Sequence, residues 1–244
     1  MSELRIDVSS IGGLAEEPPN LVGITESIPY PGTDFHVVDA EEPISFGSRC
    51  AKRSLDLLIA VPAFMFLLPV MLVLALIIRT QSKGKALYCA MRVGKNNVPF
   101  KCYKLRTMVM GADALKETLR HLNYRRGATF KVEDDPRITP FGRILRKFSL
   151  DELPQLWNVI IGDMSIVGPR PHPIDDIARY SSEDLRRHRV KPGLTGLWQV
   201  SARRDPSFRR NMKLDNLYID TWSFWTDLTI ISKTFQVVVR GDGE

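Results

Sequence analysis

The residues of this chain that are best suited to chemistry lie within one stretch, residues 143–171. Cations precede two adjacent carboxylates there, and another arginine follows in a Gly-Pro-Arg-Pro segment. An ionised carboxylate can act as a nucleophile or bind Mg²⁺ through oxygen, and its attack on a phosphoanhydride needs cations that offset the negative charge. The stretch therefore predicts a site that handles phosphate together with a metal. Its members are Arg143, Arg146, Lys147, Asp151, Glu152 and Arg170.

The two carboxylates also have a purely structural interpretation. Ser149 and Glu152 have the spacing of a capping box, in which each side chain satisfies a backbone N–H group at the start of a helix. Pro154 is tolerated in the first turn of that helix, where backbone N–H groups are still unpaired. A catalytic interpretation shares this geometry, because the positive end of a helix keeps carboxylates ionised. These residues alone leave both interpretations open.

The charge of the chain is unevenly distributed. Residues 1–50 hold nine Asp/Glu and two Lys/Arg, a balance of −7, whereas residues 51–244 hold 19 acidic and 32 basic residues, a balance of +13. This composition predicts a mostly disordered acidic tail over residues 1–50, followed by a basic part whose partners are anionic. Three scattered cysteines predict reduced thiols in a cytoplasmic setting, and the four scattered histidines predict no metal site.

An apolar segment, Leu57–Ile78, carries no charge and is long enough to cross a bilayer core of about 30 Å. Lys and Arg flank both of its ends, and the positive-inside bias would hold both ends at the cytoplasmic side. Pro62 and Pro69 lie inside the segment, and proline kinks a helix. These features predict, over residues 51–82, a helix that enters the membrane, breaks near Pro69 and returns to the same face. A single span is the alternative.

Two loosely alternating runs, residues 86–94 and 98–108, predict a short β-hairpin. Because residues two apart in a strand face the same way, Lys104 and Arg106 would present two cations together. An edge strand guarded by charge is the alternative. Further along, leucines recur on one side of residues 112–126, which predicts a basic amphipathic helix that either covers the core or lies on an anionic membrane surface.

Aromatic residues gather at Trp222, Phe224 and Trp225, just before an apolar helical pattern. Tryptophan at such a position suits a membrane–water interface, and packing into the core is the alternative.

Five segments follow one another in an order and spacing that resemble the bacterial sugar transferase family, the monotopic polyprenyl-phosphate phosphoglycosyl transferases. The resemblance covers roughly residues 51–239, and its motif set is long and specific. The segments are KRSLDLLIA, KCYKLRTM, DDPRITPFGRILRKFSLDELPQLWNVIIGDMSIVGPRP, KPGLTGLWQVSAR and LDNLYIDTWSFWTDLTIISKT.

The resemblance implies an α+β fold, predominantly α. A re-entrant membrane helix would adjoin a catalytic domain, residues 83–240, on the cytoplasmic face of the bacterial inner membrane. The implied reaction transfers a sugar-1-phosphate from a UDP-sugar to undecaprenyl phosphate and releases UMP. This step would begin the assembly of an exopolysaccharide, capsule, O-antigen or glycan.

The resemblance also implies roles for individual residues. Asp151 would attack the phosphate next to the sugar and hold a covalent phosphosugar, and Glu152 would bind Mg²⁺. Asp215 would be either an acid of the site or an acid that stabilises the fold. Contacts to phosphate or uridine would come from Lys104, Arg106, Arg146, Arg170 and Arg203.

The implied partners are the UDP-sugar, undecaprenyl phosphate and membrane lipid, with no nucleic acid. The sequence does not identify the sugar, and it leaves a monomer and a homo-oligomer open. Two positions depart from the family pattern. Leu68 stands where many relatives have serine before the proline, and Ala202 stands where many have glycine before Arg203. If that backbone position needs a positive φ, alanine is strained there.

Two other functions compete with this interpretation. A glycosyltransferase that uses Glu133-x-Asp135 as its metal-binding motif would release UDP, but the basic part lacks a clear run of alternating strands and helices. A membrane-tethered protein that only binds anions would gain nothing from the adjacent acids Asp151 and Glu152.

Overall fold

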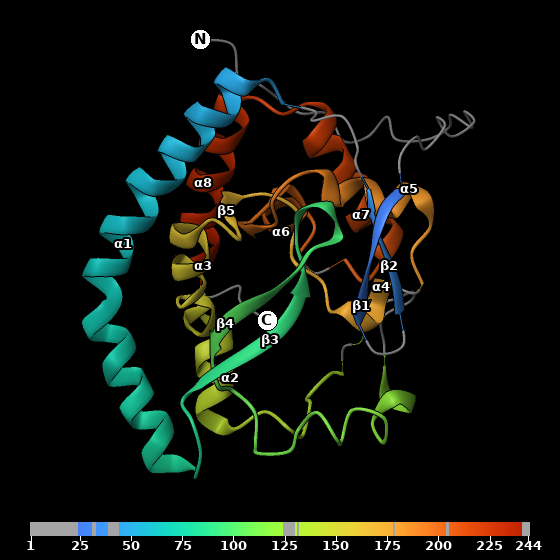
Figure 1. Ribbon diagram of the computed structural model, residues 1–244. Helices are drawn as coiled ribbons and strands as arrows, with labels where there is room; N and C mark the ends of the chain where they lie inside the picture. The colour runs from blue at the N-terminus through green and yellow to red at the C-terminus, as the bar shows by residue number, and fades with distance from the viewer. Residues whose placement is uncertain are drawn as a thin grey trace.

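The computed structural model describes residues 24–30, 33–38, 44–123, 130, 132–177, 179–203 and 205–240. Within this part the protein is mostly helical, with a long apolar helix along one side and small two-stranded sheets (Figure 1). The predicted α+β class with a predominance of helix is therefore confirmed.

Two strands lie within the predicted acidic tail. β1 (Ile24–Tyr30) and β2 (Thr33–Val38) pair as an antiparallel hairpin, so the prediction of disorder is wrong for these residues. Their sequences contain several β-branched and aromatic residues, which favour strands. Residues 1–23 of the tail lie outside the described residues.

One helix, α1 (Phe46–Gln81), contains the whole predicted membrane segment. It remains helical through Pro62 and Pro69, so the chain bends without the predicted break near Pro69 (Figure 1). A proline removes one backbone donor and presses its ring on the preceding turn, which bends a helix whose other hydrogen bonds are intact. By length and composition α1 is suited to cross a membrane, and only 11% of its most apolar window is buried.

Polar side chains bind the start of α1 to the rest of the protein. Lys52 Nζ donates to the carboxylate of Asp227 at 2.7 Å. One turn later, Asp56 Oδ1 accepts hydrogen bonds from Ser165 Oγ and from the following backbone N–H, both at 2.9 Å. These contacts tie the beginning of α1 to Asp227, in the last helix, and to strand β5 (Ser165–Val167).

The other end of α1 contacts the same body. The Arg106 guanidinium donates to the main-chain oxygens of Ser82 at 3.0 Å and Lys83 at 2.7 Å, where a helix leaves carbonyl groups unpaired. Ile78 packs in a buried cluster with Leu105. Both ends of α1 are therefore fixed to one domain, although its middle is largely exposed.

The predicted hairpin is confirmed. β3 (Leu87–Val93) and β4 (Pro99–Leu105) pair as antiparallel strands around the short turn η1 (Lys95–Asn97). The prediction that Lys104 and Arg106 present two cations together is wrong. β4 ends at Leu105, so Arg106 lies beyond the strand and turns toward α1.

The predicted amphipathic helix is absent from residues 112–123, the part of it that the structure describes. Successive turns occupy this segment and lead into a short 3-10 helix, η2 (Arg120–Leu122). Leu115 and Leu122 are 46% and 47% exposed, so no core covers the apolar side. A helix of this length is marginal without such packing.

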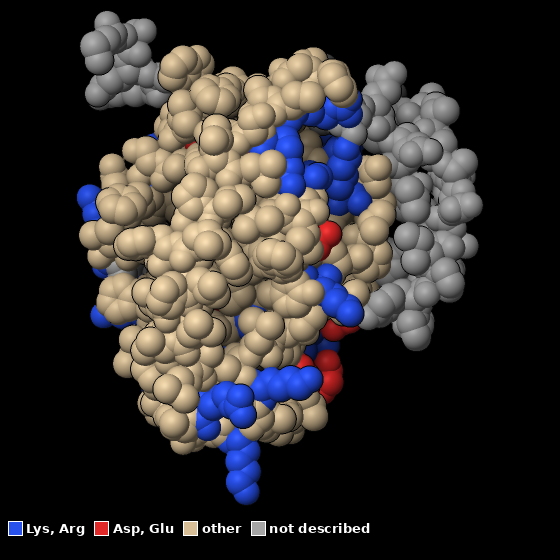
Figure 2. Space-filling model, turned by 60° about the vertical axis from the view of Figure 1, so that its left-hand side comes forward, with Lys and Arg blue, Asp and Glu red and all other residues tan. Residues whose placement is uncertain are grey.

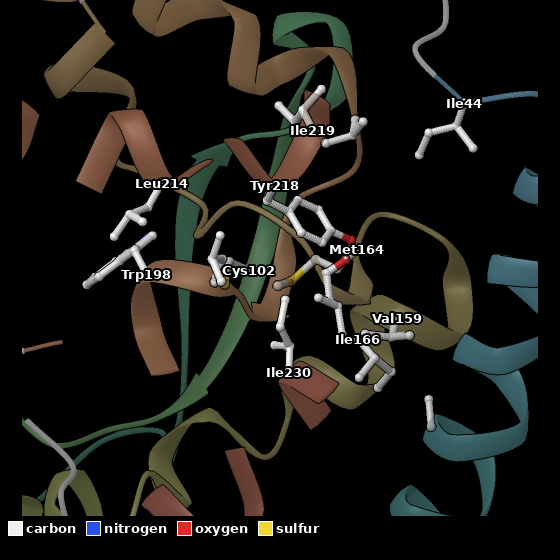
Figure 3. Packing of buried hydrophobic residues seen from close by; sticks show 14 of the residues in the cluster. Ile44, Cys102, Val159, Met164, Ile166, Trp198, Leu214, Tyr218, Ile219 and Ile230 are labelled. Atoms are coloured by element: carbon white, nitrogen blue, oxygen red, sulfur yellow. Dashed lines mark hydrogen bonds between the residues drawn. The ribbon is translucent and has the colours of Figure 1, made fainter. Parts of the chain in front are cut away.

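The remaining elements surround the principal core. Figure 3 shows Met164, Tyr218 and Ile230, which come from the segment before β5, from α7 (Phe208–Asp220) and from α8 (Phe224–Val239), gathered in one cluster. β5 pairs in parallel with β6 (Gly193–Thr195) beside this core. The other elements are α2 (Pro140–Lys147), η3 (Leu150–Glu152), α3 (Gln155–Ile161), α4 (Ile174–Ile177), α5 (Ser182–Leu185), η4 (Arg186–Arg189) and α6 (Leu197–Ser201).

The aromatic cluster before α8 divides between the core and the surface. Trp222 packs against the core and its Nε1 donates to Asp227 at 3.2 Å. Trp225 is 74% exposed. Trp222 therefore follows the core alternative, and Trp225 is left on the surface.

Candidate active site

The two adjacent carboxylates lie on a 3-10 turn that precedes an α-helix. Ser149 has the left-handed conformation, with φ of 55°, and α3 begins only at Gln155. The Ser149 side chain makes no capping hydrogen bond and instead accepts one from Arg203 Nη2 at 3.0 Å. The predicted capping box is therefore wrong, because the Glu152 side chain is bound elsewhere.

Glu152 is held between two cations from distant parts of the sequence. Lys104 Nζ lies 2.6 Å from Glu152 Oε1, and Arg170 donates to both carboxylate oxygens, at 2.7 and 3.3 Å. Burial alone would raise the pKa of Glu152, but Arg170 and Lys104 outweigh it and hold that pKa well below its usual range. Glu152 is therefore a permanently charged anchor with charge-assisted hydrogen bonds.

Asp151 has a different environment from its neighbour. It is buried, and Lys104 Nζ lies 3.8 Å from its Oδ2. No hydrogen bond to its carboxylate comes from the residues that the structure describes. Burial raises the pKa of Asp151 above its ordinary value, although Lys104 opposes that shift and Glu152 adds to it. The sequence predicted that a helix terminus keeps both carboxylates ionised, but burial and the neighbouring cations are what shift their pKa values.

Both carboxylates line a cleft of about 1170 Å³. The β3–β4 hairpin, α2, the turns before η2 and the segment around α4 form its walls. A poorly solvated carboxylate that opens into a cation-lined cleft is suited to nucleophilic attack on a phosphorylated substrate.

The predicted arginines all border this cleft, but they bind different partners. Arg143, Arg146, Arg170 and Arg203 line it together with Lys104. Arg146 Nε donates to Thr107 Oγ1 at 3.0 Å. Like the charge of Lys104, the charge of Arg146 opposes the rise in the pKa of Asp151 that burial causes.

Arg106 also borders the cleft, but its guanidinium is bound to the end of α1 and not to the carboxylates. Beside Arg203, Ala202 has φ of −140°. Alanine adopts such a backbone without strain, so the expected penalty at this position is absent.

A buried ion pair, Arg187 with Asp215, holds the main chain of Arg170 in place. Arg187 Nη2 donates to the main-chain oxygen of Arg170 at 2.6 Å and lies 2.7 Å from Asp215 Oδ2. Both side chains of this pair are 1% exposed. Burial raises the pKa of Asp215 to about 6, and Arg187 opposes that shift. Asp215 therefore follows the stabilising alternative, because it pairs with Arg187 and does not line the cleft.

The metal-binding motif of the alternative glycosyltransferase is not available. Arg137 donates to both oxygens of Asp135, at 2.9 and 2.6 Å, and both side chains are buried. A carboxylate that is satisfied in this way has no reason to exchange its partner for a metal ion.

Some residues of the cleft were not predicted from the sequence. Arg92 shares the face of the hairpin with Lys104, and the alternation of β3 contained that signal. Arg187, Asp176 and Trp198 had no local signal, because each reaches the site through tertiary packing.

We expect the buried Asp215–Arg187 pair to stabilise the fold far more than a surface pair on the same helix. Asp215→Asn leaves a buried guanidinium uncompensated and should lower the free energy of unfolding by about 3–5 kcal/mol. Asp220→Asn removes the exposed contact of Asp220 with Arg186 and should cost under about 1 kcal/mol. Chemical denaturation in detergent would measure both, and equal losses would contradict the assignment.

Sequence comparisons with known proteins match most of this chain. A family model described as bacterial sugar transferase matches residues 47–241. The chain is 42% identical over 197 residues to the exopolysaccharide production protein ExoY of Rhizobium meliloti, which covers 79% of this chain and 87% of that protein.

Two longer relatives match as well. The undecaprenyl-phosphate galactose phosphotransferase of Salmonella typhimurium is 43% identical over 200 residues, which cover 80% of this chain and 42% of that protein. The UDP-galactose-lipid carrier transferase of Erwinia amylovora is 39% identical over 238 residues, which cover 92% of this chain and 49% of that protein. The chain thus spans about half the length of these two relatives or less.

The family match runs from the start of α1 to the end of α8 and includes the lining of the cleft. It therefore includes the two adjacent carboxylates Asp151 and Glu152, called the dyad below, and the two cations that bind Glu152, Lys104 and Arg170. The chain belongs to the bacterial sugar transferase family.

Proposed function

We propose that this protein transfers a sugar-1-phosphate from a UDP-sugar to undecaprenyl phosphate at a membrane surface and releases UMP. The names of the relatives from Salmonella typhimurium and Erwinia amylovora support the lipid acceptor and the sugar donor. The name of ExoY supports a role in exopolysaccharide production.

The contrast between the two carboxylates carries this proposal. Glu152 is bound by Lys104 and Arg170, so it cannot leave its position to attack a substrate. Asp151 has no such hydrogen bonds from the described residues, and burial makes it a stronger base than an exposed aspartate. The adjacent residues would therefore divide the work, with Asp151 as nucleophile and Glu152 as the anchor of the cations.

The proposed reaction has two balanced steps. An Asp151 oxygen forms a bond to the phosphorus next to the sugar, and the bond from that phosphorus to the bridging oxygen breaks. UMP leaves with the electron pair of that bond. An oxygen of the lipid phosphate then attacks the same phosphorus, which releases the Asp151 carboxylate and gives the lipid diphosphate sugar. Lys104, Arg146 and Arg170 would offset the negative charge in both steps.

A magnesium ion fits this site only together with substrate. Among the described residues, no group of three or more acids, histidines or cysteines is placed to hold a metal. Mg²⁺ commonly binds through one or two carboxylates together with substrate phosphates. We propose that Glu152 would supply one of those carboxylates through Oε2, whose hydrogen bond from Arg170 is 3.3 Å long, with Asp151 beside it. Asp135 differs, because Arg137 holds both of its oxygens at 2.9 Å or less. The ion would neutralise part of the charge of the diphosphate.

We further propose that α1 lies in one leaflet of the bacterial inner membrane, with the cleft on the cytoplasmic side. The face occupied by α1 is almost free of charge, and Lys and Arg side chains lie around its margins (Figure 2). Leu58, Met65, Phe66 and Leu76 of α1 are each at least 65% exposed. Because both ends of α1 are bound to one domain, neither end is free to cross the bilayer alone.

The nucleotide that is released tests the proposed reaction. Membrane-bound protein with polyprenyl phosphate, Mg²⁺ and a UDP-sugar should release UMP, whereas a glycosyltransferase would release UDP. Asp151→Asn should lower turnover by at least about 10⁴-fold, because the nucleophile is lost. Asp163→Asn is a matched control: Asp163 is half-buried after α3 and does not line the cleft, and asparagine keeps a side-chain oxygen that can accept from Asn158. This variant should keep near-normal turnover. Release of UDP, or near-normal turnover by Asp151→Asn, would contradict the proposal.

The pH profile tests the electrostatic role of Lys104. Lys104 lowers the pKa of Asp151, so Lys104→Met should raise that pKa and move the acid limb of kcat/KM to higher pH by about one unit. The sign follows because Asp151 must be ionised to attack. Lys101→Met, on the exposed side of the same strand, should leave the limb in place. If the acid limb of Lys104→Met stays where it is in the wild type, the charge of Lys104 does not control the ionisation of Asp151.

Two natural cysteines test the topology. Cys50 at the start of α1 and Cys89 in β3 are both exposed and flank the apolar segment, whereas Cys102 is buried. Variants that keep only Cys50 or only Cys89 should react with a membrane-impermeant maleimide after lysis of spheroplasts, and neither should react before lysis. Labelling of the two cysteines from opposite sides would establish a single span.

A further inference from the structure

Two oppositely charged side chains of the cleft lie near one another without forming an ion pair. Asp176, in α4, is 5% exposed, and Arg92 of β3 is half-buried. Both line the cleft, and each affects the pKa of the other through its charge. Among the described residues, no side chain donates a hydrogen bond to the Asp176 carboxylate.

Such an arrangement is costly unless something fills it. A buried carboxylate without a hydrogen-bond donor loses its hydration, and burial accordingly raises the pKa of Asp176 to about 6. The neighbouring Asp175 behaves differently, because it is exposed and bound by Lys116 at 3.2 Å. Asp176 is therefore the acid of this pair that is left for a ligand in the cleft.

The hairpin fixes where this pair lies relative to the dyad. Tyr88 pairs with Lys104 and Arg92 pairs with Phe100, so Arg92 is four residues, or about 13 Å, along the same face from the end that contacts Glu152. The main chain of Arg92 also bridges to Pro173, three residues before Asp176. Burial lowers the pKa of Arg92, and Arg170, which binds Glu152, lowers it further through its charge, so Arg92 lies on the side of the cleft next to the two carboxylates. A group attached to the phosphorus that Asp151 would attack can extend toward this side.

We propose that Asp176 and Arg92 bind hydroxyl groups of the sugar of the donor, and that Asp176 is a specificity-determining residue of this enzyme. The inference rests on the proposed function and deepens it. A sugar hydroxyl donates one hydrogen bond and accepts others, so one hydroxyl can donate to Asp176 while it accepts from Arg92.

The distribution of charge favours the sugar over the nucleotide at this end. The leaving UMP carries a charged phosphate and needs cations, which Arg146 beside Thr107 and Arg203 beside Ser149 would supply. At the Asp176 end the charge of Lys116 is offset by Asp175 and that of Arg92 by Asp176, so this end suits a neutral, hydroxyl-rich sugar better than a phosphate. The donor would therefore lie with its nucleotide toward Arg203 and its sugar toward Asp176.

Kinetics with a matched control test the assignment. UDP-galactose, UDP-glucose and their N-acetylated relatives are screened with the wild-type protein, and the best donor is used for kcat/KM. Asp176→Asn should lower kcat/KM for that donor by about 10–100-fold, because the carboxylate contacts to hydroxyls are lost. The inhibition constant of UMP should stay within about twofold. Asp175→Asn should change neither quantity by more than about twofold.

A second variant and a stability measurement keep the test sharp. Arg92→Gln should repeat the pattern of Asp176→Asn, with a loss for the donor and an unchanged UMP constant. Asp176→Asn removes a buried, unpartnered charge, so its thermal unfolding should not fall below that of the wild type. Equal kinetics for Asp176→Asn and Asp175→Asn would overturn the sugar assignment. A parallel loss of UMP binding would place the nucleotide at this end and overturn it too.

The failure of the proposed function looks different. A wild-type protein that turns over no UDP-sugar with polyprenyl phosphate would overturn that function, and the sugar assignment with it. An active wild-type enzyme whose Asp176 variant keeps its donor kinetics overturns the sugar assignment alone.

Discussion

The buried contact of Glu152 with Lys104 and Arg170 is the interaction on which the rest of the site depends. It joins the β3–β4 hairpin to the Gly-Pro-Arg-Pro segment across the 3-10 turn that carries Asp151. Buried ions are expensive unless they are paired, so each partner constrains where the others lie. The Arg187–Asp215 pair extends this order outward, because Arg187 holds the main chain of Arg170. Asp151 lies beside the same cations, and among the described residues none donates a hydrogen bond to its carboxylate.

The same part of the fold connects this site to the apolar helix. Asp56 of α1 binds the backbone and side chain at the start of β5, and β5 leads within three residues to Arg170. Arg106 meanwhile closes the far end of α1, immediately after the strand that carries Lys104. One end of α1 is thus connected to Arg170 through β5, and the other end is connected to Lys104 through Arg106. The position of α1 in a membrane would thus be coupled to the geometry of the site.

The local parts of this architecture were predictable from the sequence. Length and composition showed α1, alternation showed the hairpin, and residue chemistry showed the dyad with most of its cations. The errors came from tertiary contacts. The capping box with Ser149 does not form because Glu152 binds Lys104 and Arg170. Arg106 borders the cleft, but its guanidinium is bound to the end of α1. The leucines of residues 112–123 found no core, so their helix did not form. Arg187 and Asp176 are brought to the site by tertiary packing, and no motif or spacing in the sequence predicted their positions.

The proposed mechanism requires Asp151 to carry the sugar phosphate between the donor and the lipid. Intact-mass analysis can detect this intermediate after the protein is incubated with its UDP-sugar donor and Mg²⁺ but without polyprenyl phosphate. The mechanism predicts a mass increase equal to one sugar phosphate, located on the peptide that contains Asp151 and lost when polyprenyl phosphate is added. An unmodified protein under conditions that support full turnover, or an adduct on another residue, would contradict it.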